Sequence, residues 1–305
     1  MDNWRVLDFT TFKGLLRYQR GQLIARFEDE NEKAVPLADV GTVLLGLQTA
    51  TAPALLHELA AFDIITLICD WRGVPAAAMT AWIDHGRVGA RHRAQYDMTI
   101  PRRKNAWGQI IRAKVAGQAA NLKILGHRDA EHLAAMVKLV RSGDPQNVEG
   151  TAAGYYWRRL FQSKFSRQPQ TDDNRNSMLD YGYAVLRGAG VRAVMSAGLA
   201  ASLGVFHRGR GNAFNLVDDL IEPFRPAIDY VVAATPPEMS LAHPTVKHRL
   251  VAASTQVFQP NGSSVATCLT DLAQAFGRYA EGHGDHLAVP AWAGPRSVAD
   301  EHEAA

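Results

Sequence analysis

The spacing of apolar residues changes once along this chain of 305 residues, and this change constrains the fold more than any other feature. Before residue 85, apolar residues form short β-branched or aromatic runs, which are typical of strands. Residues 52–61 instead have the spacing of a helix. We therefore predict a β-rich N-terminal domain with one short helix. Its expected strands are Trp4–Phe9, Gln22–Phe27, Val43–Leu47 and Ile64–Cys69.

Beyond Pro101, apolar residues recur at intervals of three and four, which indicates amphipathic helices. Asp129 is a candidate N-cap, and Ser142-Gly-Asp-Pro145 should end the helix that begins there. The second part of the chain is therefore predicted to be predominantly helical. The expected helices cover residues 106–125, 129–141, 148–161, 177–199, 216–232, 247–257 and 264–279.

These patterns predict an α+β protein with a small β-rich domain at residues 1–85 and a larger, all-helical domain at 101–285. A linker is expected at 86–100, and a flexible tail at 286–305, where Gly, His, Pro and acidic residues are frequent. Two cysteines cannot form a disulfide framework or a zinc site by themselves. The sequence shows no membrane span and no signal-peptide pattern, so we expect a cytoplasmic protein.

The net charge of +3 hides an uneven distribution. Residues 86–249 carry 24 basic and 13 acidic side chains, whereas the segments before and after them have an acidic excess. Most of the surplus is arginine, with 25 Arg against 8 Lys in the whole chain, and the planar guanidinium suits bidentate contacts to phosphate. Charge alone is equally compatible with a polyanionic partner and with a solvated surface.

Two segments of the helical domain carry candidate residues for chemistry. Glu149 stands at the start of a predicted helix, where an acidic residue also stabilises the helix without any further role. His207 lies in a turn punctuated by glycines and flanked by Arg208 and Arg210. Single histidines are more often structural than ligating, but two neighbouring arginines make this turn suitable for a phosphate.

A third segment, residues 215–230, is a predicted helix with one buried side. Asp219 and Glu222 are three residues apart and share a face, and Asp218 lies four residues before Glu222. Neighbouring carboxylates repel each other unless a cation lies between them. Prolines at 223 and 226 bend or end the helix and can direct Arg225 into a cleft. The alternative is a solvated acidic face, which the apolar flanks make less attractive.

A glutamate, a histidine and further carboxylates from separate helices would suit Mg²⁺ or Mn²⁺, and the imidazole favours Mn²⁺. A divalent cation among arginines is what phosphodiester chemistry requires, because both neutralise charge on the phosphate. Sequence spacing does not show that these groups meet, so the metal site is a hypothesis at this point.

Six stretches of the chain match the motifs of one known family. Those in the helical part are GVFHRGRGNAFNLVDDLIEPFRPAIDY, VEGTAAGYYWRRLF and SMLDYGYAVLRGAGVRAVMSAGL. Those in the β-rich part are WRVLDF, VPLADVGTVLLG and ITLICDWRGVP. In these stretches the chain resembles the CRISPR-associated integrases of spacer acquisition: the first matches their most distinctive motif, the second their upstream glutamate motif and the third the long helix between them. The resemblance covers about residues 1–280, and the compact chain resembles the type II form.

The resemblance implies that Glu149, His207 and Glu222 hold one Mg²⁺ or Mn²⁺ ion, assisted by Asp219. Many relatives have a small or apolar residue at the position of Asp218, so the aspartate that faces the metal stays open. The implied activity is that of a DNA endonuclease and integrase in antiviral defence. It inserts short duplexes into a CRISPR array by transesterification, with a DNA 3′-hydroxyl as the nucleophile.

The resemblance also implies three partners: double-stranded DNA, a second copy joined through the β-rich domain, and a small ferredoxin-like protein of the adaptation complex. Ten basic residues are candidates for contacts with the DNA backbone, although each alone reads as a surface residue. They are Arg102, Arg103, Lys104, Arg158, Arg159, Lys164, Arg208, Arg210, Arg225 and Arg249.

Two other functions stay open. A non-catalytic scaffold would bind duplex DNA without metal. A helical, metal-dependent phosphohydrolase usually has paired His-Asp ligands, and no His-Asp dipeptide occurs in this chain. The segment EGHGDH at residues 281–286 contains possible metal ligands, but we expect it to be a polar, flexible segment.

Overall fold

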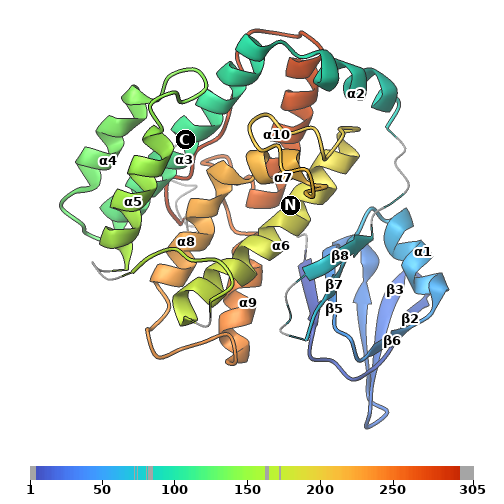
Figure 1. The fold of residues 1–305 in the computed structure, drawn as a ribbon. Helices are drawn as coiled ribbons and strands as arrows, with labels where there is room; N and C mark the ends of the chain where they lie inside the picture. Colours follow the sequence, from blue (N-terminus) through green and yellow to red (C-terminus); the bar gives the residue numbers. More distant parts are fainter. Residues whose placement is uncertain are drawn as a thin grey trace. The chain divides into compact units, whose positions relative to one another are not determined.

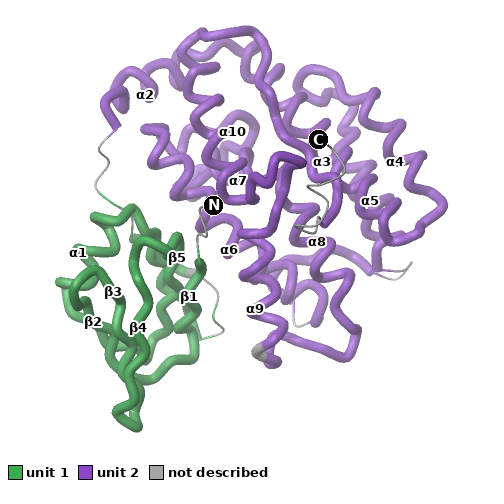
Figure 2. Tube along the Cα trace, turned by 180° about the vertical axis from the view of Figure 1, so that it is seen from behind, with its two compact units in different colours: residues 1–84 green, residues 85–305 purple. Residues whose placement is uncertain are grey.

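Strands occupy the first part of the chain and helices the rest, so the predicted α+β class is confirmed (Figure 1). The computed structural model divides into unit 1, residues 1–84, and unit 2, residues 85–305 (Figure 2). It describes residues 5–71, 73, 75–79, 81, 85–161, 165–171 and 173–295. Within these ranges, no helix is long and apolar enough to cross a membrane.

Unit 1 contains two four-stranded sheets and one α-helix, α1 (Pro53–Ala61), in its described part. The strands are β1 (Arg5–Phe9), β2 (Gly14–Gln19), β3 (Gln22–Phe27), β4 (Glu32–Pro36), β5 (Val40–Leu45), β6 (Thr49–Thr51), β7 (Ile65–Cys69) and β8 (Pro75–Met79), with a 3₁₀ turn η1 (Leu37–Asp39) before β5. One sheet has the order β1-β5-β7-β8, in which only β8 runs antiparallel to its neighbour. The other has the order β4-β3-β2-β6, in which only β6 is parallel to its neighbour.

One hydrophobic core joins both sheets of unit 1 to the helix. Leu16 and Leu23 come from one sheet, Val43 comes from the other, and Leu55 and Leu59 come from α1. All five side chains are almost completely buried. Burial of this kind stabilises a fold by about 1.5–3 kcal/mol per large aliphatic side chain. The strongly apolar strands were therefore predictable, whereas β2, β4, β6 and β8 were not predicted.

Most helices of unit 2 follow the predicted apolar stripes, with ends that differ by a few residues, but the helix predicted at 216–232 is divided into three shorter elements. Two of them are long, α3 and α6, and the candidate residues lie on the elements around them (Figure 1). The helical elements of unit 2 are α2 (Val88–Asp97), α3 (Ile100–Ile124), α4 (Ala130–Met136), η2 (Val137–Leu139), α5 (Val148–Leu160), α6 (Asn174–Ser196), α7 (Asn215–Leu220), η3 (Glu222–Phe224), α8 (Arg225–Ala233), α9 (Pro244–Ala252) and α10 (Val265–Ala280).

Close packing in unit 2 brings the candidate segments onto the two long helices. Helix α3 packs against α5, α8 and η3, and α6 packs against α7, α8 and α10. Gly190 of α6 allows a close approach, because a Cβ there would lie 2.7 Å from Val217 of α7 and 2.8 Å from Ile221. Residues far apart in the sequence thereby meet where α3, α5 and η3 come together.

The linker predicted at residues 86–100 is wrong, because α2 occupies most of it and packs against α10. The buried residues of α2 are Arg91 and Gln95. Arg91 donates hydrogen bonds to the backbone oxygen of Ala197 and to Gln274 Oε1. A helix that buries polar side chains shows no apolar stripe, and for this reason periodicity did not reveal it.

The flexible tail predicted at residues 286–305 is wrong for residues 286–295, and residues 296–305 lie outside the described part. Leu287 and Trp292 are each only 1% exposed. The indole Nε1 of Trp292 also donates a 2.7 Å hydrogen bond to Asn121 Oδ1 of α3. Two apolar anchors and one buried hydrogen bond are enough to order a segment whose composition is otherwise polar.

Candidate functional site

Capping groups fix Glu149 at the first turn of α5. Asp144 accepts hydrogen bonds from the backbone N–H of Val148 and of Glu149, each at 2.9 Å. Asn147, whose φ is +50°, accepts a bond from the N–H of Gly150 through its side chain. Because these bonds satisfy N–H groups that have no partner inside the helix, the position of Glu149 is set by the start of the helix itself.

Asp219 holds the turn that carries His207. It is fully buried on α7, and its Oδ2 accepts hydrogen bonds from the backbone N–H of Val205 at 2.5 Å and of Phe206 at 3.0 Å. Its Oδ1 accepts from the N–H of His207 and lies 2.7 Å from His207 Nδ1. The turn requires Gly204, since a Cβ there would lie 2.3 Å from the His207 carbonyl oxygen.

The bond to Asp219 defines which nitrogen of His207 can bind a ligand. With the proton on Nδ1, directed at Asp219, the lone pair is left on Nε2. This bond raises the pKa of His207, and it outweighs the opposite effect of partial burial. Burial raises the pKa of Asp219, against the hydrogen bonds that it accepts. Both carboxylate oxygens of Asp219 are already used, so the structure makes it the residue that orients His207.

Glu222 is buried in η3 and lies next to two cations. Its Oε1 is 3.0 Å from Arg225 Nε, and its Oε2 is 2.6 Å from Lys114 Nζ. Burial acts to raise the pKa of Glu222, but Arg225 and Lys114 outweigh it and the pKa is lowered. The Arg225 guanidinium also lies over the ring of Tyr183, at 4.6 Å from its centroid. Arg225, predicted to contact DNA, is therefore a partner of Glu222.

Lys114 of α3 is a site residue that sequence analysis missed. Its Nζ lies 2.6 Å from Glu149 Oε1 as well as 2.6 Å from Glu222 Oε2. Burial acts to lower its pKa, but the two carboxylates outweigh burial and the pKa is raised. One signal was present in the sequence: Lys114 lies four residues after Ile110 on the apolar stripe of α3, where a charge requires a partner.

The two adjacent aspartates of α7 point to different partners. Asp218 accepts bonds from Arg187 at 2.7 and 3.0 Å and from Asn212 at 2.7 Å. Asp219 alone contacts His207. The sequence left open which of the two faces the metal, and the contacts place Asp219 beside His207 and Asp218 beside Arg187.

The basic residues predicted to contact DNA separate into two groups. Arg102 donates to the carbonyl of Tyr279, Arg103 to those of Gln95 and Tyr96, and Arg159 pairs with Asp129. These arginines therefore connect parts of the helical unit. Lys104, Arg158, Arg208 and Arg210 are exposed, Arg249 is half-buried, and Lys164 lies outside the described residues.

The donors suit a divalent cation, although they are not arranged around one. In the part of the chain that the structure describes, no three His, Cys, Asp or Glu side chains are grouped closely enough to hold a metal ion. The buried Oε2 of Glu222 lies 2.6 Å from the Lys114 ammonium, and a carboxylate oxygen in such a position is suited to a cation. Glu149, Glu222 and Nε2 of His207 provide the oxygen-rich set with one imidazole that Mn²⁺ or Mg²⁺ accepts.

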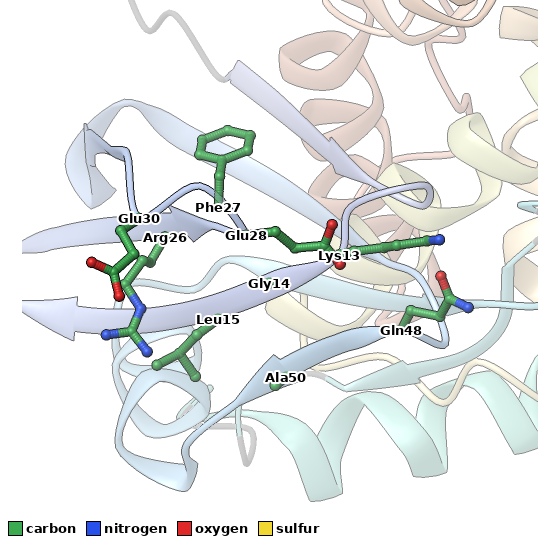
Figure 3. A pocket seen from close by; sticks show the side chains of 9 residues that line it. All are labelled: Lys13, Gly14, Leu15, Arg26, Phe27, Glu28, Glu30, Gln48 and Ala50. Atoms are coloured by element: carbon green, nitrogen blue, oxygen red, sulfur yellow. The ribbon is translucent and has the colours of Figure 1, made fainter.

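Two other places in the described structure are weaker candidates for a functional site. In the segment 281–286, Glu281 pairs with Arg87 at 2.7 Å and Asp285 with Arg102 at 3.4 Å, so its acids already have protein partners. A hollow on unit 1 is lined by charges of both signs and by none of the candidate residues (Figure 3). Its lining residues are Lys13, Gly14, Leu15, Arg26, Phe27, Glu28, Glu30, Gln48 and Ala50.

Comparisons with known proteins identify the family of the chain. The family model described as CRISPR associated protein Cas1 matches residues 9–236. The CRISPR-associated endonuclease Cas1 of Neisseria meningitidis serogroup C (strain 8013) is 36% identical over 222 residues, which is 72% of each chain. Among solved structures, a casposase bound to its integration product has a TM-score of 0.77 at 21% identity and covers 93% of this chain and 92% of its own. A Cas6-RT-Cas1–Cas2 complex has a TM-score of 0.70 at 17% identity, over 94% of this chain and 36% of that one. At such identities the two structures show a common fold.

Proposed function

Because the chain belongs to the family of CRISPR-associated Cas1 proteins, we propose that it is a metal-dependent DNA endonuclease and integrase that inserts short duplexes into a CRISPR array. The endonuclease relative and the casposase with its integration product support this role. The observation that carries the proposal is the convergence of Glu149 and Glu222. Their carboxylates come from different elements and meet on one Nζ atom, and Glu222 is close enough to raise the pKa of His207.

In this proposal Glu149, Glu222 and Nε2 of His207 hold one Mg²⁺ or Mn²⁺ ion, which neutralises charge on the scissile phosphate. Asp219 keeps the proton of His207 on Nδ1, so that Nε2 stays free to bind. The 3′-hydroxyl oxygen of the incoming duplex gives up its proton to the solvent and forms a bond to the target phosphorus. The bond from that phosphorus to the target 3′-oxygen breaks, and the departing oxygen takes up a proton. One phosphodiester replaces another, and no water is consumed.

The exposed basic residues have a separate part in the proposal. Arg208 and Arg210 stand in the turn of His207, and their guanidinium groups can neutralise phosphates on either side of the scissile one. We also propose that unit 1 joins a second copy of the chain, and that a small ferredoxin-like protein completes the assembly. The likeness to the Cas6-RT-Cas1–Cas2 complex supports the small second partner.

A strand-transfer assay tests this function. The purified chain, with and without the small partner, is mixed with a labelled duplex and a supercoiled plasmid that carries the repeat array. We expect label to join the plasmid only with Mg²⁺ or Mn²⁺, and joining to be lost in Glu149→Ala, His207→Ala and Glu222→Ala. Asp218→Ala is the matched control, because its carboxylate faces Arg187 and joining should persist.

Two results would replace the proposal. Duplex binding without joining, with partner and either metal present, would favour the non-catalytic scaffold. Metal-dependent hydrolysis of mononucleotides without action on DNA would favour the phosphohydrolase.

A further inference from the structure

Lys114 places a positive charge where the two candidate carboxylates meet. Its Nζ is 2.6 Å from Glu149 on α5 and 2.6 Å from Glu222 on η3, while Lys114 itself belongs to α3. The lysine side chain is only 12% exposed, and that of Glu222 only 5%. One ammonium group therefore connects three elements in a region with little access to water.

The two carboxylates face the same ammonium at the same distance, but they differ in burial. The Glu149 side chain is 25% exposed, whereas that of Glu222 is 5% exposed and lies against two cations, Lys114 and Arg225. A buried carboxylate is unfavourable without a cation beside it. The contact between Lys114 and Glu222 is thus an ion pair in which another cation could replace the ammonium.

We propose that Lys114 is a tethered counter-ion that competes with the divalent cation of the site. Without metal, its ammonium holds Glu149 and Glu222 side by side, and metal binding requires it to release at least one of them. This inference rests on the proposed function, because it takes Glu149, His207 and Glu222 as the metal-binding residues. The described residues support it, since both carboxylates contact the same Nζ atom.

The sign of the effect follows from the charges. An ammonium and a divalent cation repel each other, and they share the same two carboxylates. Removal of the ammonium charge should strengthen metal binding and lower the stability of the metal-free protein. If Lys114 had a purely structural role, the result would differ. Its loss would then disturb the carboxylates and leave the metal affinity unchanged or weaker.

The test is the affinity of the full chain for Mn²⁺ alone, measured by electron paramagnetic resonance of the free ion. Lys114→Met keeps an unbranched side chain without the charge, and Lys123→Met, at an exposed position of the same helix, is the matched control. We expect Lys114→Met to bind Mn²⁺ at least tenfold more tightly than wild type, which corresponds to about 1.4 kcal/mol. The control should bind like wild type. Without metal, the melting temperature of Lys114→Met should fall, and Mn²⁺ should raise it more than in wild type.

Unchanged or weaker Mn²⁺ binding in a folded Lys114→Met protein would overturn the inference. If this variant folds only with Mn²⁺, its affinity is obtained from the Mn²⁺ midpoint of refolding after correction for the free energy that folding costs. A corrected dissociation constant no lower than that of wild type would also overturn the inference. His207→Ala distinguishes failure of the inference on Lys114 from failure of the proposed function. Mn²⁺ binding that is lost in His207→Ala but does not tighten in Lys114→Met overturns this inference alone. Absence of His207-dependent binding in both wild type and Lys114→Met overturns the proposed function.

Discussion

Asp229 permits a quantitative test of the polar network behind the site. It is 1% exposed on α8, and it accepts hydrogen bonds from Tyr183 at 2.5 Å and from Tyr156 at 3.1 Å. One helical turn earlier on α8, Arg225 pairs with Glu222. The perturbation is Asp229→Asn, which replaces the ionisable carboxyl group with an amide of nearly the same shape.

Burial raises the pKa of Asp229 from 3.8 to about 7, against the opposing effect of the two tyrosine hydroxyls. A raised carboxyl pKa means that the folded protein binds a proton between pH 3.8 and about 7 that the unfolded chain does not bind. The free energy of unfolding therefore falls as pH rises through this window and levels off above it. Each pH unit inside the window is worth about 1.4 kcal/mol, so the loss from pH 5 to pH 8 is roughly 3 kcal/mol.

Urea unfolding of wild type and Asp229→Asn between pH 5 and pH 8 measures this quantity. The contributions of all other groups are common to both proteins, so they cancel in the difference. We expect the free energy of unfolding of the variant, relative to that of wild type, to rise by roughly 3 kcal/mol from pH 5 to pH 8. A difference that stays constant with pH would refute the reasoning, because it would mean that Asp229 keeps an ordinary pKa when buried.

Three further predictions concern other parts of unit 2. Asp218→Asn weakens the pair with Arg187 and should cost about 1 kcal/mol of stability without loss of strand transfer, as unfolding and joining assays would show. Trp292→Ala should cost about 3–5 kcal/mol, measured by urea unfolding, and an unchanged midpoint would contradict the packing of residues 286–295. Strand transfer should decline as pH falls through the pKa of His207, which Asp219 raises above 6.5, because a protonated Nε2 cannot bind metal. A pH–rate profile that declines only below pH 5 would contradict this.

Sequence patterns revealed those parts of the fold that bury apolar side chains. The stripe of α3 and the runs of β3 and β7 were predictable, because nonpolar burial creates the period that the sequence shows. Helix α2 was not, because it buries Arg91 and Gln95. The segment around Trp292 was not, because two anchors in a polar stretch form no period.

The residues of the candidate site likewise divide into those that the sequence indicates and those that depend on contacts in the folded chain. Glu149 and His207 could be named because their local contexts, a helix start and a glycine-rich turn, are visible in the sequence. Lys114 could be noticed as a charge on an apolar stripe, but its two partners could not be named, since they lie on elements that are distant along the chain. The separation of Asp218 from Asp219 likewise depends on Arg187, and only the folded chain shows which aspartate that arginine engages.

The most direct test of the central claim is the anomalous scattering of Mn²⁺ in crystals of the chain soaked with that ion. We expect one strong peak within bonding distance of Glu149, Glu222 and Nε2 of His207, with the Lys114 ammonium withdrawn from at least one carboxylate. A peak elsewhere, or no peak at this site at saturating Mn²⁺, would contradict the proposed metal site.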